Sequence, residues 1–416
     1  MKKILFIIGL FIVGFYNVYA KDISYSMNKY EDEVFNYIEV GYDNDLKEDG
    51  YVLGGSVLKE KIEKDEITYN DYQVLLVKYD KNDKLVWKYM YGNTSSDYID
   101  YLTYTYDDSG NIDGYLIVTR KTYDINEANV GGNSVIIKIS FEGKVVYERD
   151  INEGVITKLI PTSDGYICIV NNSLVKYNNN FEIALKRDFN EVHDISLLKE
   201  DNKVIGYAII DDNNLVTVDT NLANDVVLDD VSKYSTYNLV EANNGFILYG
   251  ITDEVKLDKG DSGYYLINYN NNGEVWETIG DTAASKDDSI ILLPIYNKDS
   301  IKEYFLLYKN EVDSSYEVIK ISLDGEVLKK VKKINNSYYS FKNFYSTGST
   351  IYFVGQINCP DDENCEYDNN SLYLVSDEDK VIEVKDGTSK NVIIVFSVLI
   401  IVLIGGIVFV RKKTKK

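Results

Sequence analysis

The feature that most constrains this chain is a pattern that recurs seven times along its middle. Each copy holds a strand that opens on Gly-aromatic or a similar pair, a variable loop, a strand that often ends in Lys-aromatic or Lys-Ile, a turn and a last strand. The copies begin at Asp49, Asp113, Asp164, Ile205, Asn244, Glu303 and Ser349, and the fourth is degenerate. Such a period is typical of units that stack, because one small unit cannot bury its own apolar surface.

The copies are built from β-strands and tight turns. Their strands are rich in Tyr, Val and Ile, with almost no helical periodicity. Glu142-Gly143, Asn272-Gly273 and Asp324-Gly325 each separate two alternating runs, and glycine supplies the positive φ that tight hairpin turns require. A further β-compatible run precedes each Gly-aromatic strand, as at Tyr37 and Tyr98. Each unit therefore contains four predicted strands.

Four-stranded antiparallel units in series predict an all-β chain folded as a β-propeller of about seven blades. The units average roughly 53 residues, near the upper end of propeller repeats. Six to eight blades fit the pattern, because the fourth copy is weak. A β-sandwich array is the alternative architecture. Residues Asp22 to Asn28 could add an outer strand to the last blade.

The first copy resembles the repeats of bacterial secreted and lipoprotein seven-bladed β-propellers. Those repeats read roughly Asp-Gly-Gly-aromatic, a Gly-Ser strand, Val-Lys-Tyr-Asp, a Gly turn, Trp, and then Gly followed by Asp. The matching positions are Gly54, Gly55, Ser56, Lys78, Tyr79, Asp80, Trp87, Gly92 and Asp97, and the fifth copy matches at Asn272, Gly273, Trp276 and Gly280. The resemblance covers most of residues 21–390 and implies a fold, not an activity.

The resemblance implies no cofactor. Quinone-dependent dehydrogenases of related propeller shape carry a tryptophan in most blades, whereas this chain has only Trp87 and Trp276. No cofactor is therefore expected.

The N-terminus predicts a secretory signal peptide over residues 1–20. Lys2 and Lys3 precede an apolar run from Ile4 to Phe15, and Val18 and Ala20 fit a cleavage site. An uncleaved membrane anchor is the alternative, but the apolar run is short for a spanning helix.

The C-terminus predicts one transmembrane helix over residues 391–410. Val392 to Val410 is uncharged and apolar, and at about 1.5 Å per residue it spans roughly 29 Å, the thickness of a hydrocarbon core. The basic tail 411–416 is expected to stay in the cytoplasm. A buried core helix is the alternative.

Together the ends predict a single-pass membrane protein with residues 21–390 outside the cell. The layout resembles Gram-positive surface proteins, although Lys385-Asp386-Gly387-Thr388-Ser389 stands where a Leu-Pro-x-Thr-Gly sorting motif would be. This difference favours a membrane-retained protein over a wall-linked one.

Charge and composition exclude several functions. The chain carries a net charge of −23, and all 67 acidic residues lie in the predicted exterior domain with 37 of the 44 basic ones. Nucleic-acid binding is not expected, because phosphate contacts need clustered Lys and Arg. One histidine and three cysteines argue against a Ser-His-Asp triad, a His-based metal site and a four-thiolate zinc site.

The remaining candidate residues mostly have ordinary explanations. Cys359 and Cys365 could close a loop disulfide in an oxidising exterior, whereas Cys168 in an apolar run predicts a buried thiol. His193 is expected to be an ordinary surface or strand histidine. The acidic stretches at 107–113 and 361–363 are oxygen-rich but do not fit a spaced calcium loop, so no metal is expected.

The sequence favours a non-enzymatic recognition module for an extracellular protein or glycan, displayed on the surface of a bacterial cell. Variable loops on a rigid frame are natural binding surfaces, and the longest runs from Lys59 to Asp71, with a second from Tyr123 to Gly132. The alternatives are a surface enzyme acting on polysaccharide through carboxylates in the propeller mouth, and a scaffold that contacts a membrane partner through its span.

Overall fold

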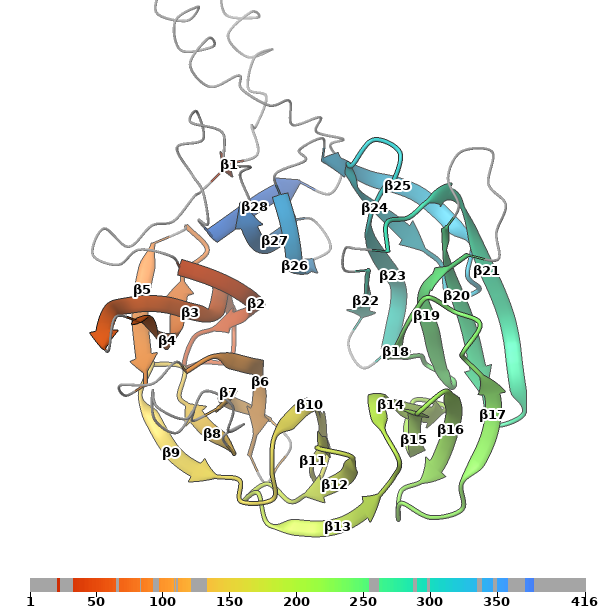
Figure 1. The fold of residues 1–416 in the computed structure, drawn as a ribbon, viewed down its shortest axis with the longest axis horizontal. Helices are drawn as coiled ribbons and strands as arrows, with labels where there is room; N and C mark the ends of the chain where they lie inside the picture. Colours follow the sequence, from red (N-terminus) through yellow and green to blue (C-terminus); the bar gives the residue numbers. More distant parts are fainter. Residues whose placement is uncertain are drawn as a thin grey trace, which may run out of the picture.

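The computed structural model describes residues 21–22, 33–64, 67–82, 84–92, 97–107, 109, 111–120, 133–253, 262–286, 290–297, 300–334, 339–346, 350–357 and 371–377. These residues form four-stranded antiparallel sheets arranged in a ring (Figure 1), and none of them is helical. The architecture confirms an all-β propeller.

Blades 1 to 3 each consist of four consecutive strands, ordered from the centre of the ring outward. Blade 1 holds β2 (Glu33–Tyr42), β3 (Glu48–Lys64), β4 (Ile67–Tyr79) and β5 (Leu85–Tyr91). Blade 2 holds β6 (Ile99–Tyr106), β7 (Ile112–Arg120), β8 (Ser134–Ile139) and β9 (Val145–Asp150). Blade 3 holds β10 (Ile156–Thr162), β11 (Gly165–Val170), β12 (Ser173–Tyr177) and β13 (Ile183–Asp188).

Blades 4 to 6 repeat this order. Blade 4 holds β14 (Val192–Glu200), β15 (Lys203–Asp211), β16 (Asn214–Asp219) and β17 (Val226–Asp230). Blade 5 holds β18 (Thr236–Glu241), β19 (Phe246–Thr252), β20 (Gly263–Asn270) and β21 (Gly273–Ala283). Blade 6 holds β22 (Ile291–Asn297), β23 (Ser300–Lys309), β24 (Tyr316–Ile321) and β25 (Val327–Ile334).

One further sheet, the closing sheet, joins the two ends of the chain. It holds β26 (Tyr339–Ser346), β27 (Thr350–Ile357), β28 (Ser371–Asp377) and the two-residue β1 (Lys21–Asp22). Lys21 pairs with Val375 and Asp22 with Leu374, in the outer position that the sequence assigned to residues 22–28. Six blades are formed by consecutive strands, and a seventh depends on this sheet, so the count of seven stays a prediction.

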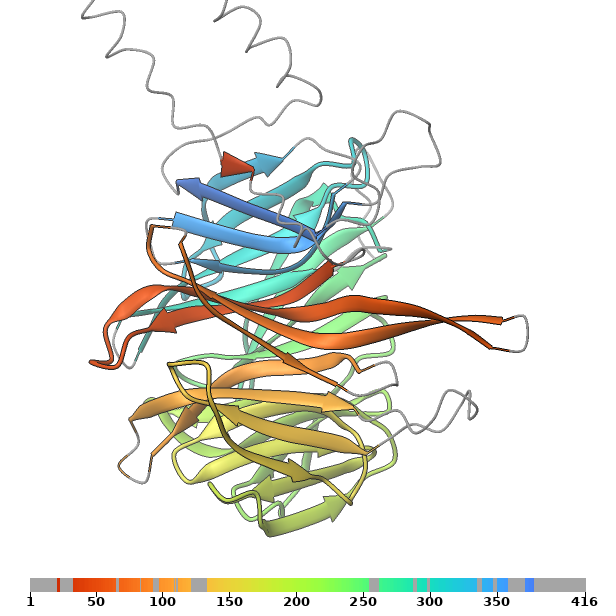
Figure 2. The same ribbon diagram turned by 90° about the vertical axis from the view of Figure 1, so that its left-hand side faces the viewer.

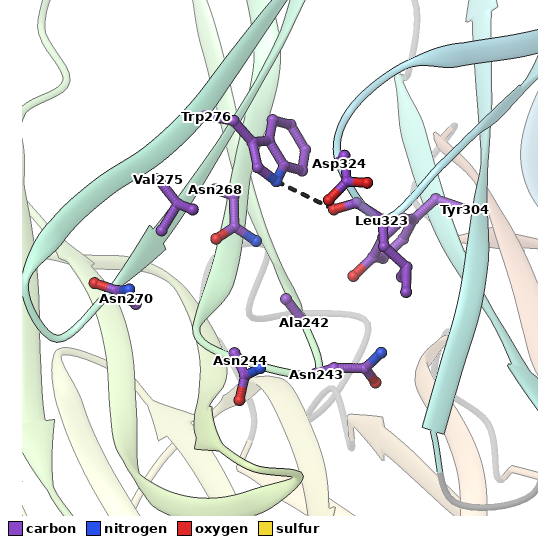
Figure 3. A pocket seen from close by; sticks show the side chains of 10 residues that line it. All are labelled: Ala242, Asn243, Asn244, Asn268, Asn270, Val275, Trp276, Tyr304, Leu323 and Asp324. Carbon is purple, nitrogen blue, oxygen red and sulfur yellow. Dashed lines mark hydrogen bonds between the residues drawn. The ribbon is translucent and has the colours of Figure 1, made fainter.

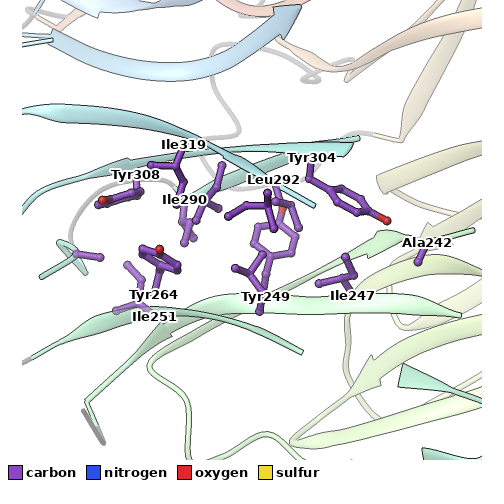
Figure 4. Close-up of a cluster of buried hydrophobic side chains, with 14 of the residues drawn as sticks. Ala242, Ile247, Tyr249, Ile251, Tyr264, Ile290, Leu292, Tyr304, Tyr308 and Ile319 are labelled. Carbon is purple, nitrogen blue, oxygen red and sulfur yellow. The ribbon is translucent and has the colours of Figure 1, made fainter. Parts of the chain in front are cut away.

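The hydrophobic core is divided among the junctions between neighbouring sheets. The cluster between blades 5 and 6 shows the pattern: Ile247 and Tyr249 of one sheet face Leu292, Tyr304 and neighbouring residues of the next (Figure 4). Similar clusters lie at the other junctions around the ring, including one in which Phe35 and Leu53 of blade 1 pack with Val354 of β27. Neighbouring sheets thus cover one another's faces.

The repeated Gly-aromatic pair supplies a buried ring to these junctions. The aromatic residue is at most 4% exposed in blades 1 to 6, at Tyr51, Tyr115, Tyr166, Tyr207, Phe246 and Tyr304. In blades 1 to 5 the residue before it is a glycine that lies against the neighbouring strand. A side chain at Gly245, where φ is +93°, would meet the carbonyl oxygen of Tyr269 at 1.8 Å.

Two tryptophans fasten one blade to the next. The indole Nε1 of Trp87 in blade 1 donates to the carbonyl oxygen of Phe141 in blade 2 at 2.8 Å, and that of Trp276 in blade 5 donates to Leu323 in blade 6 at 3.1 Å. The indoles pack on the turn glycines Gly143 and Gly325, where a side chain would collide with the ring.

Residues two positions further along the outer strands make similar contacts. A side chain there donates to a carbonyl oxygen in the turn of the next blade: Arg149 to Asn180, Arg187 to Leu222, and Thr278 to Gly325. The outer strands of blades 1, 2, 3 and 5 therefore hold the turn of the next blade through side-chain hydrogen bonds.

The predicted loop from Lys59 to Asp71 is instead mostly strand. β3 and β4 continue past the edge of the sheet as a paired ribbon that projects from the ring (Figure 2). Glu60 pairs with Asp71, and the pairing runs on to Lys64 and Ile67. The second predicted loop, Tyr123 to Gly132, lies outside the described residues.

Several sequence predictions concern residues that the structure does not describe. They are the signal peptide 1–20, the span 391–410, the tail 411–416, the Cys359–Cys365 disulfide and the acidic stretch 361–363. Within the part of the chain that is described, no helix has the length and hydropathy needed to cross a bilayer.

The tryptophan contacts predict a difference between two turn glycines. Gly143→Ala places a Cβ at 2.7 Å from the Trp87 indole, whereas Gly273→Ala meets no atom within 4 Å. Both glycines have positive φ, so both substitutions carry a backbone cost of roughly 1–2 kcal/mol. We expect Gly143→Ala to lower the free energy of unfolding, measured by urea denaturation, by about 1–3 kcal/mol more than Gly273→Ala does, because its Cβ overpacks against the indole. Equal losses would contradict the role given to this contact.

Candidate functional site

An ion pair recurs inside the blades. A lysine on the third strand meets an acidic residue at or just before the second strand. The pairs are Lys138–Asp113 in blade 2, Lys176–Asp164 at 2.8 Å in blade 3 and Lys320–Glu303 at 3.1 Å in blade 6. The lysine side chains are only 12–14% exposed, so they fill space as well as carry charge.

Lys78 stands at the same register position in blade 1. It pairs with Trp87 as Lys138 pairs with Tyr147, is 3% exposed, and its ammonium donates to the carbonyl oxygen of Tyr42. Burial lowers the pKa of Lys78, while the charges of Asp49 and Asp43 oppose that effect.

Blades 4 and 5 depart from this pattern, and blade 4 has Ile205 and Thr217 at the two positions. Asn268 pairs with Trp276 in the register position of the lysines, and Asn244 precedes Gly245 where Asp49 and Asp113 precede the glycines of blades 1 and 2. Asparagine is shorter than lysine and uncharged. Asn268 is 6% exposed, and no described residue forms a hydrogen bond with its side chain.

A pocket of about 430 Å³ opens at this position (Figure 3). It lies between blades 5 and 6 and is bordered by the turn that joins β24 to β25. Its lining consists of Ala242, Asn243, Asn244, Asn268, Asn270, Val275, Trp276, Tyr304, Leu323 and Asp324. The pocket thus occupies the place where a lysine and its partner acid stand in blades 2, 3 and 6.

Three of the four lining asparagines also serve the fold. The side chain of Asn243 both donates to the Ile301 carbonyl oxygen and accepts from the Ile301 amide, at 2.7 Å each, which ties blade 5 to blade 6. The side-chain oxygen of Asn244 accepts from the Asp201 amide, and that of Asn270 accepts from the Asn272 amide. Among the described residues, the side-chain NH₂ groups of Asn244 and Asn270 have no partner, and neither the oxygen nor the NH₂ group of Asn268 has one.

The pocket is almost uncharged. Among the residues that the structure describes, no Lys, Arg or His lines it, and Asp324 is the one carboxyl in its lining. Asp324 is exposed at the rim. The site therefore offers neutral donors and acceptors beside an indole ring, and no cation to hold an anionic group.

A second pocket, of about 410 Å³, lies between blades 3 and 4 and is acidic. Asp188 accepts from the Ser173 hydroxyl at 2.5 Å, and Asp225 meets Arg187 at 3.1 Å. The hydrogen bonds from Ser173 and Arg187 lower the pKa of Asp188 and of Asp225, respectively. Both carboxyls are ionised at neutral pH, so neither can act as a general acid.

A third pocket, of about 250 Å³, lies among the innermost strands. Its two charged lining residues, Lys158 and Glu241, tie blades together. Asp194 on β14 pairs with Lys158 on β10 and accepts from the Leu239 amide on β18 at 2.6 Å. Glu241 on β18 pairs in the same way with Lys199 on β14. Asp194 and Glu241 therefore connect the innermost strands of neighbouring blades.

Neither Asp188 nor Asp225 in the acidic pocket supplies a carboxyl of raised pKa beside a second carboxylate. Glycoside hydrolysis needs that combination, because one group must donate a proton while the other stays ionised. Glu39 on β2 does have a pKa raised to about 7 by burial, against the lowering effect of a hydrogen bond with Tyr104. Glu39 lines none of the three pockets.

The structure also places other residues that the sequence singled out. Cys168 is buried without a disulfide, and burial raises its thiol pKa well above the usual value, which confirms the predicted buried thiol. His193 is exposed on β14 with its ring near Tyr237, which confirms a surface histidine. Asp107 accepts from the amides of Ser109 and Asn111 and thereby shapes its turn.

Sequence reasoning did not identify Asn244 and Asn268 as site residues. A signal for them exists, because the two residues replace an acid and a lysine that recur elsewhere in the repeat. It becomes visible only when the copies are aligned by strand register, since 23 residues of sequence separate the two positions.

Comparisons with known proteins add little to this description. No known protein family matches the sequence, and no curated protein is similar to it. Among solved structures, one titled "Structure of Dos1 propeller" is similar with a TM-score of 0.47 and 9% identity, over 88% of this chain and 97% of that one. Another, "Complex of KlAtg21 with coiled-coil of AgAtg16", has a TM-score of 0.44 and 11% identity, over 77% and 99%. The fold assignment rests on the sheets themselves.

The raised pKa of Glu39 predicts a pH-dependent stability. Between about pH 4.5 and 7 the carboxyl ionises in the unfolded chain but stays protonated in the folded one, so folding stability falls as pH rises through this window. We expect Glu39→Gln to be more stable than the wild type by about 1–3 kcal/mol at pH 8. The two proteins should converge at pH 4, as measured by urea denaturation. A constant difference at both pH values would contradict the assignment.

Proposed function

We propose that this chain is a cell-surface recognition module that binds its ligand in the pocket between blades 5 and 6. The observation that carries the proposal is the Asn244 and Asn268 pair, which replaces a recurring ion pair and leaves a buried amide open to a ligand. The surrounding ring is fixed by hydrogen bonds between blades, such as those of Asn243 and Trp276. A rigid frame with a preformed polar pocket is suited to binding.

The cellular setting in this proposal comes from the sequence. Residues 1–20 direct secretion, 391–410 anchor the chain in the membrane of a Gram-positive bacterium, and the acidic ectodomain stays soluble outside. The resemblance to bacterial secreted propellers supports this setting. We also propose that the closing sheet is a seventh blade, since β1 completes its four strands.

The alternative of a polysaccharide-cleaving surface enzyme has less support. It requires a proton-donating carboxyl beside a carboxylate, and the acidic pocket between blades 3 and 4 instead holds Asp188 and Asp225 with lowered pKa values. A scaffold that contacts a membrane partner through its span is the other alternative. Exchange of residues 391–410 for an unrelated span would abolish the activity of such a scaffold and would not affect binding in the pocket.

The proposal is tested by restoring the ion pair of the other blades. In Asn244→Asp with Asn268→Lys, the lysine would occupy the pocket, and the introduced carboxylate would still accept from the Asp201 amide. We expect a free energy of unfolding within about 1 kcal/mol of the wild type, because ion pairs of this kind contribute little. Cells that display the variant should lose adhesion to plates coated with cell wall, mucin or serum protein.

The control is a variant with the same added charges outside the pocket, Asn213→Asp with Asn221→Lys. Both asparagines lie in exposed turns of blade 4. This variant should adhere as the wild type does. If the pocket variant adheres normally to every coat that the wild type binds, recognition through this pocket is wrong.

The setting is tested by protease treatment of intact cells that express the full chain. We expect the propeller to be cleaved from the outside and residues 411–416, tagged at the C-terminus, to remain protected with the membrane fraction. Release of the full chain into the medium would contradict the anchor, and full protection would contradict the orientation.

A further inference from the structure

We propose that the pocket between blades 5 and 6 binds a neutral sugar unit of a glycan. This inference rests on the proposed function and names the class of ligand for the same site. Its basis is one pocket whose described lining combines the Asn268 amide, which has no partner among the described residues, with further donors, a carboxylate and an indole, and includes no cationic side chain.

The polar groups match hydroxyl groups. The Asn268 side chain offers both a donor and an acceptor, and a sugar hydroxyl can donate and accept at once. Asn268 is 6% exposed, lines the pocket and has no hydrogen-bond partner among the described residues, so a ligand can pair with both its donor and its acceptor. The NH₂ groups of Asn244 and Asn270 add donors, and Asp324 adds an acceptor at the rim.

The apolar part of the lining matches the C–H face of a sugar ring. Trp276 and Val275 border the pocket on blade 5 and Tyr304 borders it on blade 6 (Figure 3). The hydrogen bond from Trp276 to the Leu323 carbonyl oxygen fixes the indole in place. A fixed aromatic surface loses little side-chain entropy when a ligand packs on it.

Charge and size narrow the class further. Without a lysine, arginine or histidine in the lining, a carboxylate, sulfate or phosphate group on the ligand would have no cationic partner. Asp324 would repel it. A volume of about 430 Å³ lies toward the lower end for small-molecule sites, which suits one or two sugar units.

A peptide is a less suitable occupant. Extended peptides bind along the free edge of a strand, where main-chain groups form a regular row. Here Asn244 lies in the β18–β19 turn, Asn268 lies on β20 and Asn270 is the last residue of β20, and the β24–β25 turn borders the same pocket. They form a cluster and not a row.

Tryptophan fluorescence provides the test, because the chain has only two tryptophans. In full-length Trp87→Phe, Trp276 is the sole indole and reports on the pocket. The protein is titrated with cellobiose, maltose, lactose and N,N′-diacetylchitobiose, and in parallel with glucuronic acid, sialyllactose and a blocked tetrapeptide. We expect at least one neutral disaccharide to shift the emission with a Kd on the order of 0.1–10 mM, and the acidic sugars and the peptide to bind at least tenfold more weakly.

Substitutions of Asn268 test whether the disaccharide binds to its side-chain amide. Asn268→Leu keeps the approximate shape and removes the polar group, and we expect at least tenfold weaker binding of that disaccharide. Asn244→Asp with Asn268→Lys should remove binding altogether. It replaces Asn268→Leu as the test variant if the leucine variant does not fold. Asn213→Ala, in an exposed turn of blade 4, should bind as before.

The outcomes separate this inference from the proposed function. No response to any neutral disaccharide at 20 mM, unchanged binding by both Asn268 variants, or stronger binding of the peptide or an acidic sugar would overturn the sugar assignment. If adhesion still disappears in Asn244→Asp with Asn268→Lys, the pocket keeps its proposed role in recognition although its ligand is not a neutral sugar. Sugar binding with unchanged adhesion would support the site and overturn its role in adhesion.

Discussion

Burial of one sheet against the next is the interaction on which the rest of this structure depends. Each blade is too small to cover both of its faces, so its apolar residues are buried only when a neighbour is present. The contacts repeat around the ring: a buried aromatic after each motif glycine, and an outer-strand side chain that holds the next blade's turn, as Trp87 holds Phe141 and Arg187 holds Leu222. The innermost strands add carboxylates such as Asp194, which binds groups from the blades on both sides. Stability is therefore distributed among many junctions.

This repetition also explains why the candidate site stands out. A repeated frame gives each position several equivalents in the same molecule, so a difference at one of them can be judged against the others. Lysines fill the space beside the second strand in blades 1, 2, 3 and 6, whereas Asn268 leaves it open in blade 5. The ring loses one internal ion pair there and gains an accessible amide. The loss is small, because Asn243 and Trp276 still connect blade 5 to blade 6.

Local signals allowed much of the fold to be predicted from the sequence. Turn glycines such as Gly143 and Gly325 identify hairpins, because few other residues adopt their backbone angles at low cost, and the Gly-aromatic pair identifies the second strand of a blade. Prediction failed where the outcome depends on pairing. The stretch from Lys59 to Asp71 contains charged and polar residues typical of a loop, yet its two halves pair with each other as a ribbon. The pocket was missed for a similar reason, since Asn244 and Asn268 meet only through the register of three strands.

The closing sheet has a consequence for the order in which the molecule folds. Strands within blades 1 to 6 pair with their sequence neighbours, so these contacts require short loops and can form early. The pairing of Lys21 with Val375 joins positions far apart in the sequence, and the loop that it closes is the longest among the pairings of the described strands. We expect the ring to shut last and to reopen first there, at the sheet where β1 meets β28, while the remaining blades keep their mutual packing. The slowest step of folding and the earliest step of unfolding would then share one location.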